Sequence, residues 1–315
     1  MRDIAILLNP SAGRGRAGRK IRLLENRLRD YGLNYDILES ESPEHLERLS
    51  AERSRADEII VGAGGDGTFN VIVNELMRIN RDAIFGMINL GTRGDIAREY
   101  GTDTIEKACE AIKERVYRRT DVAALKYDGK GPLYFLGTAS LGLEDFIDKR
   151  ISQLLDRHPF MNKYVGLRFI ELVLGIAYSK SALKSGEIPV RVKIEHDTGT
   201  FDDKIVLAVV NNTRYFDNGK IPSPEASPYD GKIDCCVVGD VPFFVLLNDY
   251  RLFSQANHTN RTEISIIQSS KFKIAAPNGI GIQVDGETLG RYKDISLSVR
   301  PQALRVLVHP QYVRG

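Results

Sequence analysis

The sequence predicts an α/β fold in which an N-terminal α/β domain is followed by an antiparallel β-sandwich domain. Ahead of about Asp121, short apolar runs alternate with amphipathic stretches, which is typical of the βα units that build a parallel sheet. Beyond this residue the apolar runs are short and are bounded by Gly, Pro, Asn and Asp, as in antiparallel sheets. The length of 315 residues also favours two folding units that share a cleft.

The first part of the chain predicts four strands separated by helices. The helix predicted over residues 17–29 places Ile21, Leu24 and Leu28 on one face. Another helix follows a glycine-rich loop, and its inward-facing residues are Phe69, Ile72, Val73, Leu76 and Met77. The strands are expected at residues 4–8, 34–38, 58–61 and 84–90, and the remaining helices at residues 44–54 and 104–115.

The second part predicts mainly strands. They are expected at residues 189–194, 204–211, 232–238, 263–268, 271–276 and 280–284. Residues 162–179 instead have the pattern of an apolar helix. Arg168 and Glu171 interrupt this helix, so we predict that it does not span a bilayer. It either covers one face of the sheet or forms a lid or acyl-chain wall, and the sequence leaves both open.

Composition and charge are those of an ordinary globular protein, with 42% apolar residues, 27% charged residues and a net charge of +2. A chain this close to neutral is expected to have no nucleic-acid partner. The apolar run at residues 4–8 is too short for a signal peptide, so a cytoplasmic location is expected. Neither a disulfide framework nor a zinc site fits the spacing of the cysteines, Cys109, Cys235 and Cys236.

Two segments have the G-x-G-x-x-G spacing of a dinucleotide-binding loop, at residues 13–18 and 62–67. In a dinucleotide fold the first glycine follows its strand directly, whereas Gly13 is separated from its strand by four residues, although Glu39 falls at a plausible distance. Asp66 inside the second loop would repel a pyrophosphate unless a magnesium ion lay between them. The second loop therefore favours a nucleoside triphosphate bound with Mg²⁺, with backbone N–H groups and a helix N-terminus facing the phosphates.

The loop Gly64-Gly65-Asp66-Gly67-Thr68, preceded by Asn9-Pro10-Ser11-Ala12-Gly13, resembles the diacylglycerol kinase catalytic-domain family, which includes bacterial lipid kinases and is related to sphingosine kinases. Further matches follow in the family's order, at residues 91–98, 121, 135–142, 229–234 and 284–287. The resemblance implies an N-terminal domain like that of phosphofructokinase and NAD kinases, over residues 1–121 with the tail at about 302–315. It also implies a β-sandwich lipid-substrate domain over residues 122–301, with ATP in the cleft.

The resemblance also implies roles for individual residues. Glu287 matches the family's proton acceptor for the substrate hydroxyl, with Asp285 beside it and Asp66 holding catalytic Mg²⁺. The residues expected to bind the nucleotide and its metal are Asn9, Pro10, Ser11, Ala12, Gly13, Ser40, Gly64, Gly65, Asp66, Gly67, Thr68, Phe69, Asn70, Thr92, Asp95 and Asp121. A structural Mg²⁺ site is implied at Asp234, helped by the backbone carbonyls of Gly231 and Cys236, and Lys163 matches a basic residue of the acidic network.

The implied activity is transfer of the γ-phosphate of ATP to the hydroxyl of a diacylglycerol- or sphingoid-type lipid, in transient contact with a membrane surface. Residues 162–179 and Phe243-Phe244 are the surfaces expected to meet the membrane. Two positions depart from the family pattern, because Gly94 stands where asparagine is usual and Val71 where an acid is common. These departures keep open a non-catalytic lipid- or nucleotide-binding protein.

The glycine loop does not by itself select one enzyme. Gly-Gly-Asp-Gly-Thr also occurs in NAD kinases, so an NAD kinase-like enzyme is a second candidate. Taken alone, Asp285-Gly286 and Asp230-Gly231 also fit plain hairpin turns. The sequence does not choose the lipid alcohol or the nucleotide base, and it leaves a homodimer open.

Overall fold

The computed structural model describes residues 4–13, 17–56, 58–79, 82–143, 145–147, 150, 176–177, 180–242, 245–246 and 251–313. Most of the helix predicted over residues 162–179 lies outside these ranges, with Lys163 and Phe169, and so does Phe243-Phe244. Within the described ranges, no helix combines the length and the apolar character that crossing a membrane requires.

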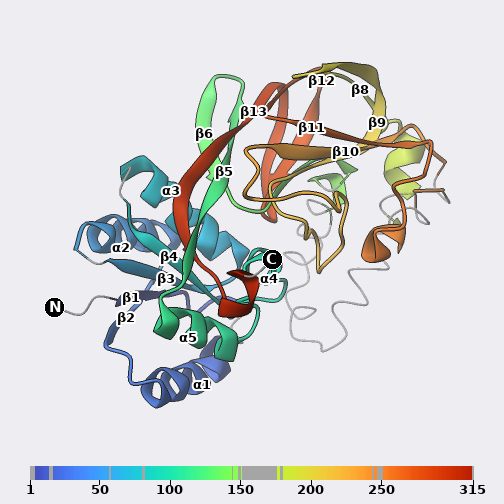
Figure 1. The fold of residues 1–315 in the computed structure, drawn as a ribbon. Helices are drawn as coiled ribbons and strands as arrows, with labels where there is room; N and C mark the ends of the chain where they lie inside the picture. Colours follow the sequence, from blue (N-terminus) through green and yellow to red (C-terminus); the bar gives the residue numbers. More distant parts are fainter. Residues whose placement is uncertain are drawn as a thin grey trace.

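The N-terminal part is a parallel sheet with helices on both faces (Figure 1). Its strands are β1 (Ile4–Leu8), β2 (Tyr35–Glu39), β3 (Ile59–Gly64) and β4 (Ile84–Asn89), in the order β2-β1-β3-β4. Its helices are α1 (Ala17–Asp30), α2 (Pro43–Ala56), α3 (Asp66–Ile79), α4 (Asp95–Glu99) and α5 (Ile105–Glu114). Helices α1 and α5 pack on one face and α2, α3 and α4 on the other, so every residue of β1 and β3 is buried.

The C-terminal part is built from antiparallel strands, as predicted. They are β5 (Tyr117–Tyr127), β6 (Lys130–Phe135), β7 (Thr138–Gly142), β8 (Val190–His196), β9 (Gly199–Asn211), β10 (Ile233–Gly239), β11 (Ile264–Ser269), β12 (Lys271–Val284) and β13 (Glu287–Leu307). The hydrogen-bonded path runs β11-β10-β9-β7-β12-β13, while β5 and β6 extend from β13 and β8 joins β9 to β12. One apolar cluster fills the space between these strands, which makes this part a β-sandwich.

Strand β13 connects the two parts. It pairs antiparallel with β12 and β5, and then pairs in parallel with β4, where Arg305 lies opposite Ile84. Figure 1 shows β13 and β5 passing from the sandwich to the edge of the parallel sheet. Arg305 and Val306, in the tail predicted at about 302–315, thus pair with a strand of the parallel sheet, and the domain boundaries stay a prediction.

The elements differ from the predicted ones at a few places. The hairpin β5–β6, the long strand β13 and the short helix α4 were not predicted. The two strands predicted at residues 271–276 and 280–284 are one strand, β12, whose register with β13 shifts between Ala275 and Ile280. Pro277-Asn278-Gly279 therefore forms an irregularity within a strand, where the sequence suggested a break.

Candidate functional site

A cavity of about 460 Å³ lies where the parallel strands end, at the edge that the β12–β13 hairpin approaches. Carboxyl ends of parallel strands share one edge of a sheet, and the connections after β1, β2, β3 and β4 all contribute to its walls. Of the predicted site residues, those that line it are Asn9, Ser11, Ala12, Gly13, Ser40, Gly65, Asp66, Gly67, Thr68, Thr92, Asp285 and Glu287. The structure therefore brings together residues from both ends of the chain.

The turn after β1 is tied to the start of α3 through Asn9. The Asn9 amide Nδ2 donates to Thr68 Oγ1 at 3.0 Å, and its Oδ1 accepts the backbone N–H of Ser11 at 3.0 Å. The backbone N–H of Asn9 donates to Ala63 O at 2.9 Å, near the end of β3 and just before the glycine loop. These bonds hold the two glycine-containing connections together, and residues of both line the cavity.

Asp66 begins helix α3, where a negative charge is favoured by the helix dipole. Its Oδ2 accepts the backbone N–H of Gly94 at 3.2 Å, while its Oδ1 is buried and has no hydrogen-bond partner among the described residues. Burial, and then the charge of Asp95, raise the pKa of Asp66 to about 6. A buried carboxylate oxygen without a hydrogen-bond partner is a ligand that a hard cation such as Mg²⁺ would satisfy.

The hairpin between β12 and β13 turns at Asp285 and Gly286, with Val284 opposite Glu287 and φ positive at both turn residues. The reading of Asp285-Gly286 as a hairpin turn therefore holds, and the same turn also lines the cavity. Asp285 Oδ1 accepts the N–H of Thr138 at 2.8 Å, and Asn70 Nδ2 donates to Asp285 Oδ2 at 3.2 Å. Burial, and after it the charge of Asp66, raise the pKa of Asp285 to about 7.

Glu287 follows this turn and meets the start of α3. Its Oε1 lies 2.8 Å from the position that a Cβ on Gly67 would take. Desolvation raises the pKa of the Glu287 carboxyl above its ordinary value. A carboxylate from the sandwich thus stands against the glycine loop of the parallel sheet, inside the cavity.

Several predicted residues do not line this cavity. Phe69 is fully buried in the core and packs edge-on against Phe85 at 6.2 Å between ring centres, so its side chain has a packing role. Asn70 does not line the cavity and donates a hydrogen bond to Asp285. Ser40 does line the cavity, but its hydroxyl donates to Leu8 O at 3.1 Å. Those outside the lining are Pro10, Gly64, Phe69, Asn70, Asp95, Asp121, Gly231, Asp234 and Cys236.

Asp121, which was expected to help organise catalytic magnesium, joins three segments of the chain in the structure. Its Oδ1 accepts the N–H of Gln302 at 2.8 Å and its Oδ2 accepts the N–H of Gly231 at 2.6 Å. Both carboxylate oxygens are therefore engaged by backbone N–H groups from distant segments, and Asp121 is fully buried. This carboxylate fastens β5 to the end of β13 and to the loop before β10.

Asp234 is buried at 2% exposure on β10, and its Oδ2 has no hydrogen-bond partner in the described part of the chain. Burial, and then the charge of Asp230, raise the pKa of Asp234 to about 6. Cys236 is fully buried two residues further along the strand. Across the residues that the structure describes, no group of three or more His, Cys, Asp or Glu side chains is arranged to hold a metal ion.

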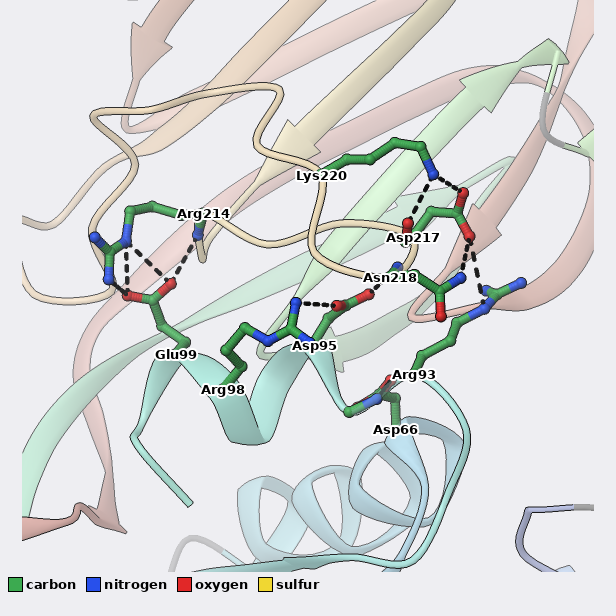
Figure 2. A network of polar contacts seen from close by, with 10 residues as sticks. Asp66, Arg93, Asp95, Arg98, Glu99, Arg214, Asp217, Asn218 and Lys220 are labelled. Carbon is green, nitrogen blue, oxygen red and sulfur yellow. Dashed lines mark hydrogen bonds and ion pairs between the residues drawn. The ribbon is translucent and has the colours of Figure 1, made fainter. Parts of the chain in front are cut away.

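Three residues that were not predicted contribute to the site. Arg93 lines the cavity, and Asn89 ends β4 with its Oδ1 accepting the N–H of Gly91 at 3.0 Å. Asp217, from a loop of the sandwich, forms an ion pair with Arg93 at 3.8 Å (Figure 2). The sequence contained indications of two of these residues. Arg93 lies in the Gly91–Arg98 motif, and Asp217 begins a cluster of turn residues, Asp217-Asn218-Gly219, after a strand.

Asn89 accounts for the glycine at position 94. A Cβ on Gly94 would lie 2.0 Å from Asn89 Nδ2, and Gly94 has a φ of 71°. The Asn89 carboxamide therefore fills the space in which a side chain at position 94 would begin. We infer that an asparagine at this position, as is usual in the family, would have to displace the Asn89 carboxamide.

This crowding gives a double-mutant prediction. Gly94→Asn alone is expected to destabilise the protein by about 1–3 kcal/mol, the usual cost of overpacking. Asn89→Ala alone should cost about 1 kcal/mol for its hydrogen bond to Gly91, and Asn89→Ala/Gly94→Asn should be more stable than Gly94→Asn. Thermal melting of the four proteins measures this coupling. Additive losses in the double variant would show that the two positions do not compete for space.

Comparison with known proteins identifies two matching families. The model of the diacylglycerol kinase catalytic domain matches residues 3–125, and that of the YegS C-terminal NAD kinase beta sandwich-like domain matches residues 170–308. A diacylglycerol kinase of Bacillus subtilis (strain 168) is 23% identical over 297 residues, covering 91% of this chain and 90% of that protein. A diacylglycerol kinase of Staphylococcus saprophyticus is 23% identical over 235 residues, covering 74% of this chain and 72% of the other.

The fold is also similar to that of solved structures. The crystal structure of a diacylglycerol kinase from Bacillus anthracis str. Sterne superposes with a TM-score of 0.71 at 18% identity, covering 98% of both chains. This likeness extends over both the parallel sheet and the sandwich, so it concerns the arrangement of the whole chain.

Proposed function

Because the chain belongs to the diacylglycerol kinase catalytic-domain family, we propose that it is an ATP-dependent kinase that phosphorylates the hydroxyl of a diacylglycerol- or sphingoid-type lipid. The observation that carries this proposal is the meeting of Glu287 with Gly67 in one cavity. A base from the sandwich then faces the loop that would hold the nucleotide phosphates. Phosphoryl transfer needs this juxtaposition of a positioned acceptor and a bound polyphosphate.

The residues of the cavity divide the proposed work between them. The backbone around Ser11, Gly13, Gly65 and Gly67, with the N-terminus of α3, would bind the phosphates. Glu287 would take the proton of the acceptor hydroxyl, for which a raised carboxyl pKa is favourable. Mg²⁺, when bound, would neutralise charge on the phosphates, and Asp66 is the residue whose buried Oδ1 fits it.

Asp285 has a supporting position in this scheme. Its carboxylate is held by Thr138 and Asn70, so it keeps the hairpin turn against α3 and orients the following Glu287. A lipid acceptor also implies a transient contact with a membrane surface, because its acyl chains stay in apolar surroundings while its hydroxyl reaches Glu287. This contact is part of the proposal.

The test is transfer of label from γ-labelled ATP, with Mg²⁺, to a panel of lipid alcohols and NAD in detergent micelles. The proposal expects labelled lipid from the wild type and none from Glu287→Ala. Labelled NAD instead would identify an NAD kinase-like enzyme. No labelled product from any acceptor, although ATP binds, would support a non-catalytic nucleotide-binding protein.

We also propose that Asp234 ligates a structural Mg²⁺ with the backbone carbonyls of Gly231 and Cys236. Its buried, unpartnered Oδ2 is the supporting observation in the described part of the chain. The folded-state pKa of about 6 lies above the ordinary 3.8, so the contribution of this group to stability is present below about pH 4 and is lost as pH rises through 6. At higher pH the ionised carboxylate destabilises the folded protein unless a cation binds it.

Thermal melting at about pH 8 tests whether Asp234 binds Mg²⁺. If Asp234 binds Mg²⁺, adding MgCl₂ to the wild type should raise the melting temperature by several degrees. Without Mg²⁺, Asp234→Asn should melt at a higher temperature than the wild type. Its melting temperature should rise less on addition of MgCl₂, because only Mg²⁺ binding at the nucleotide site remains. Equal shifts with Mg²⁺ in the wild type and in Asp234→Asn would rule this site out.

A further inference from the structure

Arg93 lines the cavity and has no role in the proposed reaction so far. Its acidic lining residues are Glu41, Asp66, Asp285 and Glu287, whereas among the described residues that line it the basic one is Arg93. A polyphosphate in this cavity would be repelled most strongly by the buried carboxylates of Asp66 and Asp285, and this repulsion would weaken its binding. A fixed cation in this place would therefore have a large effect on where the phosphates sit.

Arg93 reaches from the parallel-sheet part toward the β12–β13 hairpin. It lies in the turn between β4 and α4, and its Nη1 is 3.0 Å from the position that a Cβ on Gly286 would take. The guanidinium thus lies against the turn that separates Asp285 from Glu287. Arg93 also lines a second, smaller cavity of about 30 Å³, to which Asp66 and Asp285 contribute. Its side chain therefore stands where the two cavities meet, close to the proposed base.

Asp217 holds this arginine from the sandwich side, as Figure 2 shows. Arg93 Nε lies 3.8 Å from Asp217 Oδ1, to which Asn218 Nδ2 also donates at 3.2 Å. Lys220 Nζ lies 2.5 Å from the other oxygen, Oδ2, and donates to Asp217 O at 2.8 Å. Asn218 and Lys220 therefore hold the carboxylate of Asp217 in addition to its ion pair with Arg93.

The loop that carries Asp217 is anchored on helix α4 (Figure 2). The backbone N–H of Asn218 donates to Asp95 Oδ2 at 2.9 Å. Arg214 Nη2 lies 3.0 Å from Glu99 Oε1, and the backbone N–H of Arg214 donates to Glu99 Oε2 at 3.0 Å. Since α4 follows Arg93 closely, the anchors and the Arg93–Asp217 pair fix the same short region from both parts of the chain.

We propose that Arg93 binds the γ-phosphate of the nucleotide and stays in contact with it during transfer, and that Asp217 is the residue that positions its guanidinium. This inference rests on the proposed kinase function and deepens it. In the step, the bond from the γ-phosphorus to the β,γ-bridging oxygen breaks and its electron pair leaves on ADP. The acceptor oxygen forms the new bond to phosphorus, and the acceptor proton passes to Glu287.

An arginine suits this position for a physical reason. The guanidinium is planar, stays charged at every physiological pH and presents several N–H groups that match phosphoryl oxygens. Charge on those oxygens is redistributed in the transition state, where a preorganised cation in a desolvated cavity stabilises it more than in water. Lysine would keep the charge and lose the forked geometry, so Arg93→Lys should retain part of the activity.

The experiment compares wild type, Arg93→Ala, Arg93→Lys and Asp217→Asn, with Arg119→Ala as a matched control. Arg119 pairs with Asp82 at a half-exposed site outside both cavities. Turnover with the lipid acceptor is measured, together with the dissociation constants of ADP and of the β,γ-imido analogue of ATP, both with Mg²⁺. The analogue carries the γ-phosphate and ADP does not, so their ratio reports the contact that Arg93 makes.

Arg93→Ala is expected to lower kcat by about 10²-fold or more, the effect of removing one oxyanion-stabilising donor. Its affinity for the ATP analogue should fall about tenfold, the loss of one charge-assisted contact, while its affinity for ADP is unchanged. Asp217→Asn should lower kcat by about tenfold and shift the analogue-to-ADP ratio in the same direction, which a merely structural role would not do. Arg119→Ala should match the wild type in all three measurements.

Two results would overturn the inference. Equal losses of ADP and analogue affinity in Arg93→Ala would place Arg93 at the other phosphates, and unchanged affinities and turnover would exclude contact altogether. In both cases an active wild type leaves the kinase proposal standing. A wild type that transfers no label and binds neither nucleotide would overturn the kinase proposal, and the role of Arg93 with it.

Discussion

Glu287→Gln is expected to lower turnover by about 10²–10⁴-fold while its affinity for ATP stays close to that of the wild type, because glutamine keeps the shape and cannot take a proton. Glu287 is the carboxylate that the hairpin brings against Gly67, and desolvation raises its pKa. Steady-state transfer of labelled phosphate to the lipid, with ATP binding measured separately, checks the prediction. Turnover within about twofold of the wild type would remove Glu287 from the role of base.

A matched variant separates the position of this carboxylate from its chemistry. In Gly67→Ala the new Cβ would lie 2.8 Å from Glu287 Oε1, so the carboxylate has to move although it is still present. A partial loss of turnover is expected, smaller than that of Glu287→Gln, with an unchanged melting temperature. Full turnover in Gly67→Ala would mean that the contact between the hairpin and α3 does not set the geometry of transfer.

Asp66→Asn is expected to remove measurable transfer, because it deletes the charge of the buried carboxylate that fits Mg²⁺. In the wild type, activity should fall as the pH is lowered through about 6–7, since Asp66 has a pKa of about 6 and Asp285 of about 7. The Asp66 and Asp285 carboxyls repel each other when ionised, so they titrate as a pair, and protonation of Glu287, whose pKa is also raised, adds to the same acid limb. Below these pKa values the carboxyls are protonated, and Asp66 loses the negative charge that would attract Mg²⁺.

The measurement is a pH profile of kcat/KM for ATP at two Mg²⁺ concentrations. Higher Mg²⁺ should move the acid limb to lower pH, because a bound cation favours the ionised carboxylate. Asp103→Asn is the control, since Asp103 is paired with Lys107 outside the cavity. A limb that stays at the same pH when Mg²⁺ changes would separate these carboxylates from the metal.

Stability should follow the opposite direction with pH. The folded-state pKa values of Asp66 and Asp285 lie above the ordinary value of 3.8, so their favourable contribution is full below about pH 4 and is lost as pH rises through 6–7. The cavity thus costs stability at neutral pH in the metal-free protein. Sites that hold charges ready for a ligand commonly show this cost.

Local sequence patterns were sufficient for the parallel-sheet half. The strand at residues 4–8 was predicted to the residue, because a fully buried parallel strand is a short, continuous apolar run. Helix α3 was predicted after the glycine loop because its apolar residues recur at helical spacing. The motifs also identified the loops that line the cavity, because the parallel strands all end at the same edge of the sheet and these loops follow them.

The strands that link the two halves were harder to predict. Strand β5 begins with Tyr117-Arg118-Arg119, which is mostly exposed and polar, and its buried run starts only at Thr120. Strand β13 spans 21 residues and leaves one sheet region to join another, so its burial alternates irregularly. A period of two is visible only where one face of a strand stays buried along its whole length.

The sequence by itself determined which residues could bind phosphate and carry a proton, because residue type and the local strand–loop–helix order decide these capacities. Only the tertiary structure decided which of the acids share a cavity. It engages Asp121 with the backbone of Gly231 and Gln302, and it brings Asp217 to Arg93. The physical reason is that a carboxylate takes its role from the donors and charges around it, and here those neighbours come from segments more than a hundred residues apart along the chain.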